Sequence, residues 1–86
     1  MMEQQERMEI IKRLKTIRGH IQGVEKMIED EKHCDEVMQQ ITAIKSSVEK
    51  VGWLIIRDHA ADCLLSEPVT KEEVNRTIQR IAQFLK

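Results

Sequence analysis

The sequence predicts an all-α fold with three helices per chain. Apolar residues recur in steps of three and four along most of its 86 residues, which is the spacing of one helix face. Only three glycines and one proline interrupt that spacing. Aromatic residues make up 2% of the chain, so we expect a core of Ile, Val, Leu and Met side chains. Because a chain this short forms only a marginal core alone, we also expect it to oligomerise.

The first helix is expected over about residues 6–29. Its apolar residues follow steps of 4, 3, 4, 3 and 4, as in an amphipathic helix that packs along another helix. They are Ile10, Leu14, Ile17, Ile21, Val24 and Ile28. Gly19 and Gly23 lie within this stretch and are candidates for a close approach of two helices. The charged residues 29–32 then predict a turn.

The second helix is expected over about residues 34–65, which is long for a globular protein. Its apolar residues again follow steps of four and three. They are Val37, Ile41, Ile44, Val48, Val51 and Ile55. Further steps of four reach His59 and then Cys63. Because long helices are stabilised mainly by packing, we expect a partner helix along most of this one.

Pro68 breaks the second helix, and a third is expected over about residues 70–85. Thr70 and Glu73 have the spacing of a capping box, in which the hydroxyl caps the helix and the carboxylate reaches back. The residues expected to point inward are Val74, Ile78, Ile81 and Leu85. No repeat, low-complexity segment or linker divides the sequence, so we expect residues 1–86 to form a single domain.

The charge balance limits the kinds of partner. A net charge of −1 gives no general attraction to nucleic acid, so DNA binding would need a local basic patch. The N-terminus is polar, and the longest apolar run, residues 51–56, is too short to span a bilayer. We therefore expect a cytoplasmic protein with no membrane partner. In a reducing compartment, its two cysteines favour metal or redox chemistry over a disulfide.

Three side chains are candidate metal ligands: Cys34, His59 and Cys63. His59 and Cys63 lie four residues apart on one helix face, so both can point at one ion. Cys34 lies 25 residues before His59, which is about 37 Å along a straight helix. The three groups meet if two chains run antiparallel, so that Cys34 of one chain lies beside the other two residues of its partner. This geometry predicts an antiparallel helical dimer with two equivalent sites between its subunits.

The donor set favours a soft metal ion, because thiolates prefer Cu(I) and Zn and imidazole accepts either. Cu(I) is preferred, since a structural zinc site would need a fourth ligand such as His33 or water. A His-x-x-x-Cys pair alone is a weak indication, because cysteine often packs as a small hydrophobic residue. By the same standard, His20 and His33 are typical of ordinary surface histidines.

A basic stretch of the first helix is the candidate DNA surface. Residues 7–18 hold five cations and a single acid, Glu9. The cations are Arg7, Lys12, Arg13, Lys15 and Arg18, and Lys45 and Lys50 of the second helix would extend the patch. On one chain this pattern is also typical of a solvated helix face, but an oligomer repeats it as several phosphate-binding stripes. Because we find no helix-turn-helix pattern and no aromatics for stacking single strands, duplex DNA is favoured.

Three stretches of the sequence resemble a known family. Residues 13–23 (RLKTIRGHIQG) are similar to its first-helix signature, residues 34–41 (CDEVMQQI) to the opening of its second helix, and residues 58–63 (DHAADC) to its closing pair of ligands. Together they resemble the copper-sensitive operon repressors, which belong to a wider family that includes nickel/cobalt, formaldehyde and persulfide sensors. The resemblance covers about residues 8–65 well and the last helix only by its pattern.

The resemblance implies a tetramer that is a dimer of dimers. It also implies trigonal Cu(I), held by Cys34 of one subunit and by His59 and Cys63 of another. The implied function is a copper(I)-responsive transcriptional repressor that binds operator DNA in the apo form and dissociates when Cu(I) binds. Of the candidate DNA contacts Arg13, Lys15, Arg18 and Lys50, the resemblance points to Arg13 and Lys50 in particular.

The chain departs from the family pattern at two places. Copper-sensing members usually carry Tyr before the first cysteine, where this chain has His33. They also carry a Glu in the third helix that is hydrogen-bonded towards the ligand histidine, where this chain offers Asn75, Arg76 and Gln79. Such groups orient a ligand and couple it to the fold. His33 is therefore a candidate neighbour of the metal or an added ligand, which would favour a divalent ion.

Four other functions are compatible with parts of the pattern. A persulfide-responsive repressor would use Cys34 and Cys63 alone, and a zinc- or nickel-responsive variant would use the same site for another ion. A copper carrier would use the metal ligands without any DNA role. An enzyme would need a third group to orient a Cys–His nucleophile pair. No such group is evident, so we expect no enzymatic activity.

Overall fold

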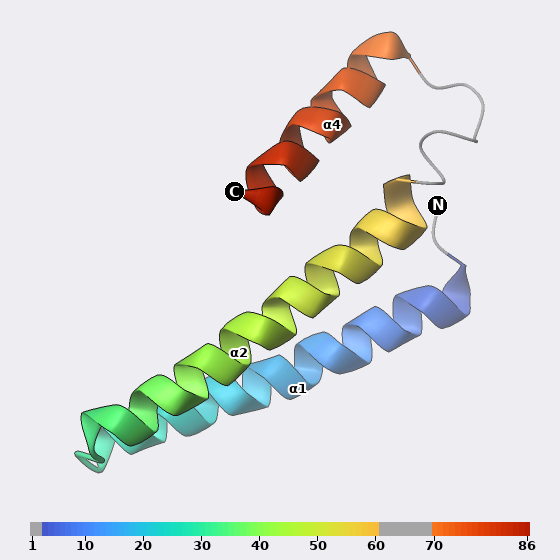
Figure 1. The fold of residues 1–86 in the computed structure, drawn as a ribbon. Coiled ribbons are helices and arrows are strands. Elements are labelled where there is room, and N and C mark those ends of the chain that lie inside the picture. Colours follow the sequence, from blue (N-terminus) through green and yellow to red (C-terminus); the bar gives the residue numbers. More distant parts are fainter. Residues whose placement is uncertain (1–2, 61–69) are drawn as a thin grey trace.

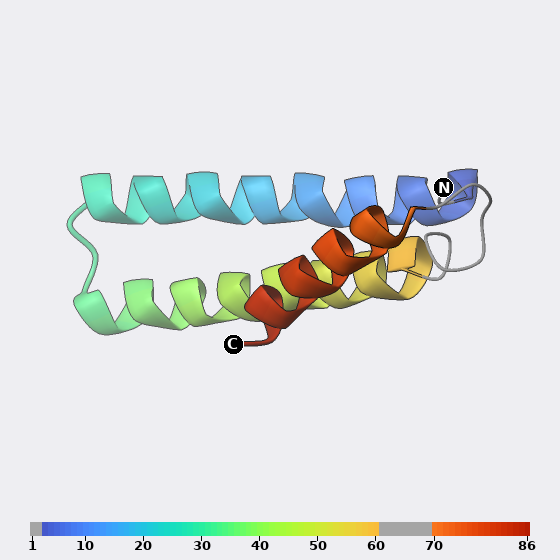
Figure 2. The same ribbon diagram turned by 90° about the horizontal axis from the view of Figure 1, so that it is seen from above.

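The computed structural model describes residues 3–60 and 70–86, and every element it describes is helical (Figure 1). The elements are α1 (Gln4–Glu29), α2 (Cys34–Ile55), the π-helical turn η1 (Ile56–Ala60) and α4 (Lys71–Leu85). α1 and α2 form a long antiparallel hairpin, and α4 runs back along α2 on a face that α1 does not cover (Figures 1 and 2). The molecule is elongated, measuring 53 × 28 × 15 Å. The prediction of an all-α fold with three α-helices is confirmed.

The turn between α1 and α2 is tight, as the charged residues 29–32 predicted. The backbone N–H of Glu31 donates to Ile28 O at 3.1 Å, and that of Lys32 donates to Met27 O at 2.9 Å. These two bonds define a Schellman motif, which needs one residue in the left-handed region. Glu31 is that residue, with φ of 53°. Glycine is the usual residue at this position, because it adopts positive φ without strain.

α2 begins directly after this turn and ends earlier than the sequence pattern suggested. His33 caps its N-terminus, since His33 Nδ1 accepts a hydrogen bond from the backbone N–H of Asp35 at 3.2 Å. The α-helix ends at Ile55, and η1 continues the helix as a wider π turn as far as Ala60. The rest of the segment expected to be helical, residues 61–65, lies outside the described residues. A pattern of four-residue steps cannot distinguish an α turn from a π turn, because both continue the helix.

α4 begins with the residue pair that the capping box indicated. Thr70 Oγ1 accepts a hydrogen bond from the backbone N–H of Glu73 at 3.1 Å. At the other end of α4, Phe84 meets Trp53 of α2 edge to face, with ring centroids 6.1 Å apart. Gly52 makes this approach possible, because a Cβ atom there would clash with the Phe84 ring. Gly19 and Gly23, the candidates for a close approach, have nothing within 4 Å of such an atom.

The core of the hairpin uses only part of the predicted apolar pattern. Its buried residues are Ile10, Ile17 and Val24 of α1 and Ile44, Val51 and Leu54 of α2, with Val37 packed against them. A second set of apolar residues, four positions further along each helix, stays exposed. We call this set the outer stripes; it consists of Leu14, Ile21 and Ile28 of α1 and Ile41, Val48 and Ile55 of α2, which are 37–63% exposed. Four residues turn a helix by about 40° beyond one full turn, so the outer stripes lie beside the buried contact and not within it.

Candidate DNA groove and metal ligands

A groove of about 540 Å³ lies between α1 and α2, in the half of the hairpin away from the turn. We call it the basic groove. It is lined by Glu9, Lys12, Arg13, Thr16 and Ile17 of α1 and by Ser46, Ser47 and Lys50 of α2. Three of these side chains are cations, three are hydroxyls, and one is an acid. This composition suits an oxyanion ligand, because cations and hydroxyl groups are common partners of phosphate oxygens.

The register of the hairpin brings cations of both helices together at this groove. Arg13 lies 17 residues before Asp30, the C-cap of α1, and Lys50 lies 17 residues after His33, the N-cap of α2. In an antiparallel hairpin, residues at equal distances from the turn face one another. Arg13 and Lys50, which sequence analysis linked only by resemblance, therefore line the same groove.

The other two candidate DNA contacts lie elsewhere. Lys15 and Arg18 are exposed on α1 but do not line the basic groove. Lys12 does line it, although sequence analysis placed it only in the general basic stretch. Counting residues from the turn would also have indicated Lys12, because it is next to Arg13 in the sequence.

The hydroxyl groups of the groove differ in what they can donate. Thr16 Oγ1 donates to Lys12 O at 3.1 Å, and Ser47 Oγ donates to Ala43 O at 3.1 Å. Each of these hydroxyls has its proton directed into its own helix, which leaves only acceptor lone pairs. Ser46 makes no such bond within the described residues, so its hydroxyl can donate to a ligand. Sequence analysis assigned no role to Ser46, Ser47 or Thr16.

Two residues that line the groove, Arg13 and Glu9, form an ion pair with each other. Arg13 Nη2 lies 3.4 Å from Glu9 Oε1, one helical turn apart on α1. Both side chains are close to half exposed, at 43% and 49%. Exposed pairs of this kind contribute little stability, because water competes for both partners. The pair is therefore easily exchanged for another partner.

The predicted metal ligands are described only in part. Cys34 is the first residue of α2, and its thiol is free and exposed. His59 lies in η1, but its side chain is outside the description, and Cys63 lies outside the described residues altogether. Residues 34 and 59 are at opposite ends of one continuous helical segment (Figure 1). Within the described part of one chain, no three His, Cys, Asp or Glu side chains gather around a common point.

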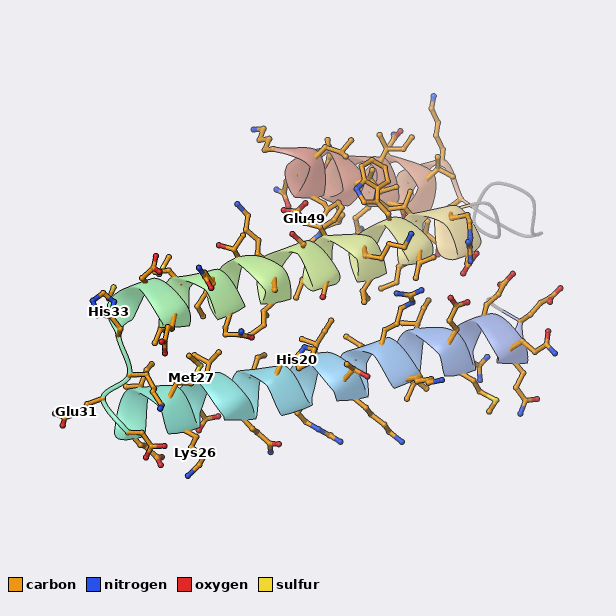
Figure 3. The ribbon with its side chains drawn as sticks, turned by 60° about the horizontal axis from the view of Figure 1, so that its bottom comes forward. His20, Lys26, Met27, Glu31, His33 and Glu49 are labelled. Carbon is orange, nitrogen blue, oxygen red and sulfur yellow. The ribbon has the colours of Figure 1, made fainter. Side chains whose placement is uncertain are left out.

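His33 has a structural role at the start of α2 (Figure 3). Because its Nδ1 accepts from Asp35 N, this nitrogen carries no proton and is occupied by the helix cap. A metal could bind Nδ1 only if the cap opened. Its other nitrogen, Nε2, carries the proton in this tautomer. In this structure His33 therefore holds the start of α2 in place.

Sequence analysis missed a buried carboxylate at the other end of α2. Asp58 is 8% exposed, and it accepts hydrogen bonds from Arg57 Nε at 2.7 Å and from Arg57 Nη2 at 3.1 Å. These hydrogen bonds are the main cause of the raised pKa of Arg57, to which Glu9 and Glu6 also contribute. The signal for this burial was present, because Asp58 continues the seven-residue spacing of the buried positions Ile44 and Val51.

Comparison with known proteins gives the family directly. The family described as metal-sensitive transcriptional repressor matches residues 6–86, which is nearly the whole chain. The chain belongs to this family. The resemblance noted in the sequence is thereby confirmed, and the enzyme alternative is removed, because the family consists of transcriptional repressors.

Characterised relatives of this repressor are named as copper sensors. The chain is 40% identical over 53 residues to the copper-sensing transcriptional repressor CsoR of Mycobacterium tuberculosis, covering 62% of the chain and 44% of that protein. It is 32% identical over 59 residues to CsoR of Bacillus subtilis, covering 69% of the chain and 58% of that protein. The chain thus spans about half the length of the curated relatives it matches.

A solved structure supports the fold of the repressor. A variant of the formaldehyde-responsive regulator FrmR from Salmonella enterica serovar Typhimurium superposes with a TM-score of 0.78. The match covers 96% of this chain and 93% of that one, at 23% sequence identity. Similarity at this level shows a shared fold. None of the described helices is long and apolar enough to cross a bilayer.

Proposed function

We propose that this chain is a copper(I)-responsive repressor that binds operator DNA without metal and releases it when Cu(I) binds. The observation that supports DNA binding most strongly is the basic groove, where Lys12, Arg13 and Lys50 converge from two helices. Copper is supported by the names of the relatives in Mycobacterium and Bacillus. A protein with this role acts in the cytoplasm.

The basic groove suits the backbone of duplex DNA. Its cations would neutralise phosphates, and the hydroxyl of Ser46 would donate to a phosphate oxygen. Contacts of this type position a protein on DNA without reading its bases. Operator preference would then depend largely on the shape and deformability of the duplex.

The outer stripes support a homotetramer formed as a dimer of dimers. Six apolar side chains in continuous seven-residue spacing are exposed on one hairpin, which is the pattern that a second helical surface covers. If two α2 helices pair antiparallel through this surface, the exposed Cys34 of one subunit lies near the far end of its partner's helix. The two chains then complete two equivalent sites.

The donor groups fit Cu(I). We propose that Cys34 of one subunit and His59 and Cys63 of the other hold the ion. Cys34 is unbridged, exposed and the first residue of α2, so its sulfur is accessible to an ion. The protein residues supply the soft donors and their spacing, and the ion supplies the link between two subunits. Affinity should fall in acid, because protons compete for the thiolates.

The DNA half of the proposal is tested with single substitutions in the groove. Lys50→Ala should weaken binding of apo protein to its own upstream promoter and reduce the salt dependence of that binding, since about one phosphate contact is lost. Lys71→Ala removes the same charge from α4, outside the groove, and is the matched control. Equal effects of the two substitutions would contradict the assignment of the groove.

The metal half of the proposal is tested with His59→Ala. A Cu(I) sensor should keep its DNA binding in the apo form and lose its response to copper. A persulfide sensor that uses Cys34 and Cys63 would keep its response to persulfide in the same variant. Release by zinc or nickel, but not by Cu(I), would show that the site serves a divalent ion.

A further inference from the structure

We propose that Glu9 acts as a built-in competitor of DNA phosphate for Arg13 and thereby limits the affinity of the basic groove. This inference rests on the proposed DNA-binding function. It assigns to Glu9 a role that is opposite to that of the cations around it. The carboxylate occupies the guanidinium in free protein, and a phosphate of the duplex must displace it.

The geometry of the pair is suited to exchange. The distance of 3.4 Å between Arg13 Nη2 and Glu9 Oε1 is long for a charge-assisted hydrogen bond. Only one nitrogen of the guanidinium makes this contact, so it is not the bidentate arrangement in which Arg holds a carboxylate most firmly. A phosphate oxygen that enters the groove can therefore replace the carboxylate without breaking a rigid structure.

Glu9 is the single acid among the residues that line the groove. Its charge also acts beyond α1, since it contributes to the raised pKa of Arg57 in η1. Because the residues that line the groove come from both helices, the carboxylate lies at the groove and not on the outer side of α1. In this position it would repel an incoming phosphate as well as hold Arg13.

The other two cations of the groove, Lys12 and Lys50, differ from Arg13 in their ion pairing. Within the described residues, no acid forms an ion pair with Lys12 or Lys50. Both lysines are ready for phosphate in the free protein. Arg13 alone must first leave a partner, so the competition should act specifically through this residue.

The test compares the affinity of two variants for the upstream promoter. Glu9→Gln keeps the size of the side chain and removes its charge. Glu25→Gln is the matched control, because it removes the same charge from an exposed position of the same helix, roughly 160° around the axis from Glu9. We expect Glu9→Gln to lower the Kd of the apo protein roughly three- to fivefold in low salt, with a smaller gain as salt screens the charges. Glu25→Gln should leave the Kd nearly unchanged.

A second arm repeats Glu9→Gln in an Arg13→Ala background. If Glu9 acts by occupying Arg13, most of the gain disappears there, and the residual change stays within about twofold. An equal gain with and without Arg13 would overturn the inference, because it would show general repulsion of DNA. So would equal affinities of the Glu9 and Glu25 variants. Failure of the wild-type protein to bind the duplex is a separate result, which would remove the proposed function and this inference with it.

Discussion

Glu31 is a single residue on which the geometry of the hairpin depends. It adopts a φ of 53° in the Schellman turn, which costs a residue with a side chain more than it costs glycine. Glu31→Gly should therefore stabilise the protein by roughly 0.5–1 kcal/mol. Denaturant unfolding at a fixed protein concentration measures this change. Glu29→Gly is the control, because it places glycine in the last turn of α1 and should destabilise by up to about 1 kcal/mol. Destabilisation by both substitutions would contradict the strain at Glu31.

Substitutions of His33 can show whether this residue only caps α2 or also binds the metal ion. Its Nδ1 caps α2, so His33→Ala should cost about 1 kcal/mol of stability, while His33→Asn should keep most of it. The two variants separate the roles when copper affinity is also measured. If His33 only positions the start of α2, the Asn variant keeps its copper affinity. Equal loss of affinity in both variants would show that the imidazole is itself a ligand.

At the scale of elements, the contact between α2 and α4 depends on Gly52. A Cβ atom at this position would clash with the ring of Phe84, so Gly52→Ala should displace the C-terminal end of α4. Trp53, the only tryptophan of the chain, reports this event because it contacts Phe84 edge to face. Trp53 is already 52% exposed, so we expect a small further red shift of its emission as the ring loses its contact with Phe84. Gly19→Ala, where the new atom meets nothing within 4 Å, should leave the emission unchanged. An unshifted spectrum in the Gly52 variant would contradict this docking.

The elements themselves could be predicted well from the sequence. Apolar spacing indicated three helices, and Thr70 indicated the start of α4, because both signals depend on neighbouring residues. The change to a π turn at Ile56 could not be predicted, since the spacing is compatible with either type of turn. Nor could the spacing show that Leu14 and Ile21 are exposed while Ile10 and Ile17 are buried. Both stripes are equally apolar, and only the packing of α1 on α2 separates them.

The candidate site was predictable only where it depends on register. Arg13 and Lys50 came from the resemblance, yet their equal distance from the turn would have paired them independently. Glu9 was noted only as an exception among cations. Its contact with Arg13 depends on side-chain geometry that spacing does not give. The predicted metal set of Cys34, His59 and Cys63 spans two chains and stays a prediction.

At the scale of the whole molecule, the outer stripes predict that the hairpin is not the complete functional unit. Val48 lies at the centre of the α2 stripe and is 47% exposed. Val48→Lys should weaken self-association while the hairpin core stays intact, because a buried unpaired charge at an interface is strongly unfavourable. Sedimentation velocity measures the shift to smaller species, and circular dichroism checks the helix content. Gln39→Lys adds the same charge on the opposite side of α2 and should leave association unchanged. Equal sedimentation of the two variants would contradict an interface at the stripe.

The central claim is that the protein binds DNA through the basic groove and that Cu(I) binding at a second site weakens this DNA binding. The most direct test is titration of Cu(I) into the reduced wild-type protein bound to its labelled upstream promoter, followed by fluorescence anisotropy. We expect anisotropy to fall to the value of free DNA as the sites between subunits fill, and DNA in turn to weaken copper binding by the same factor. An unchanged complex at saturating Cu(I), with both thiols verified as reduced, would contradict the account.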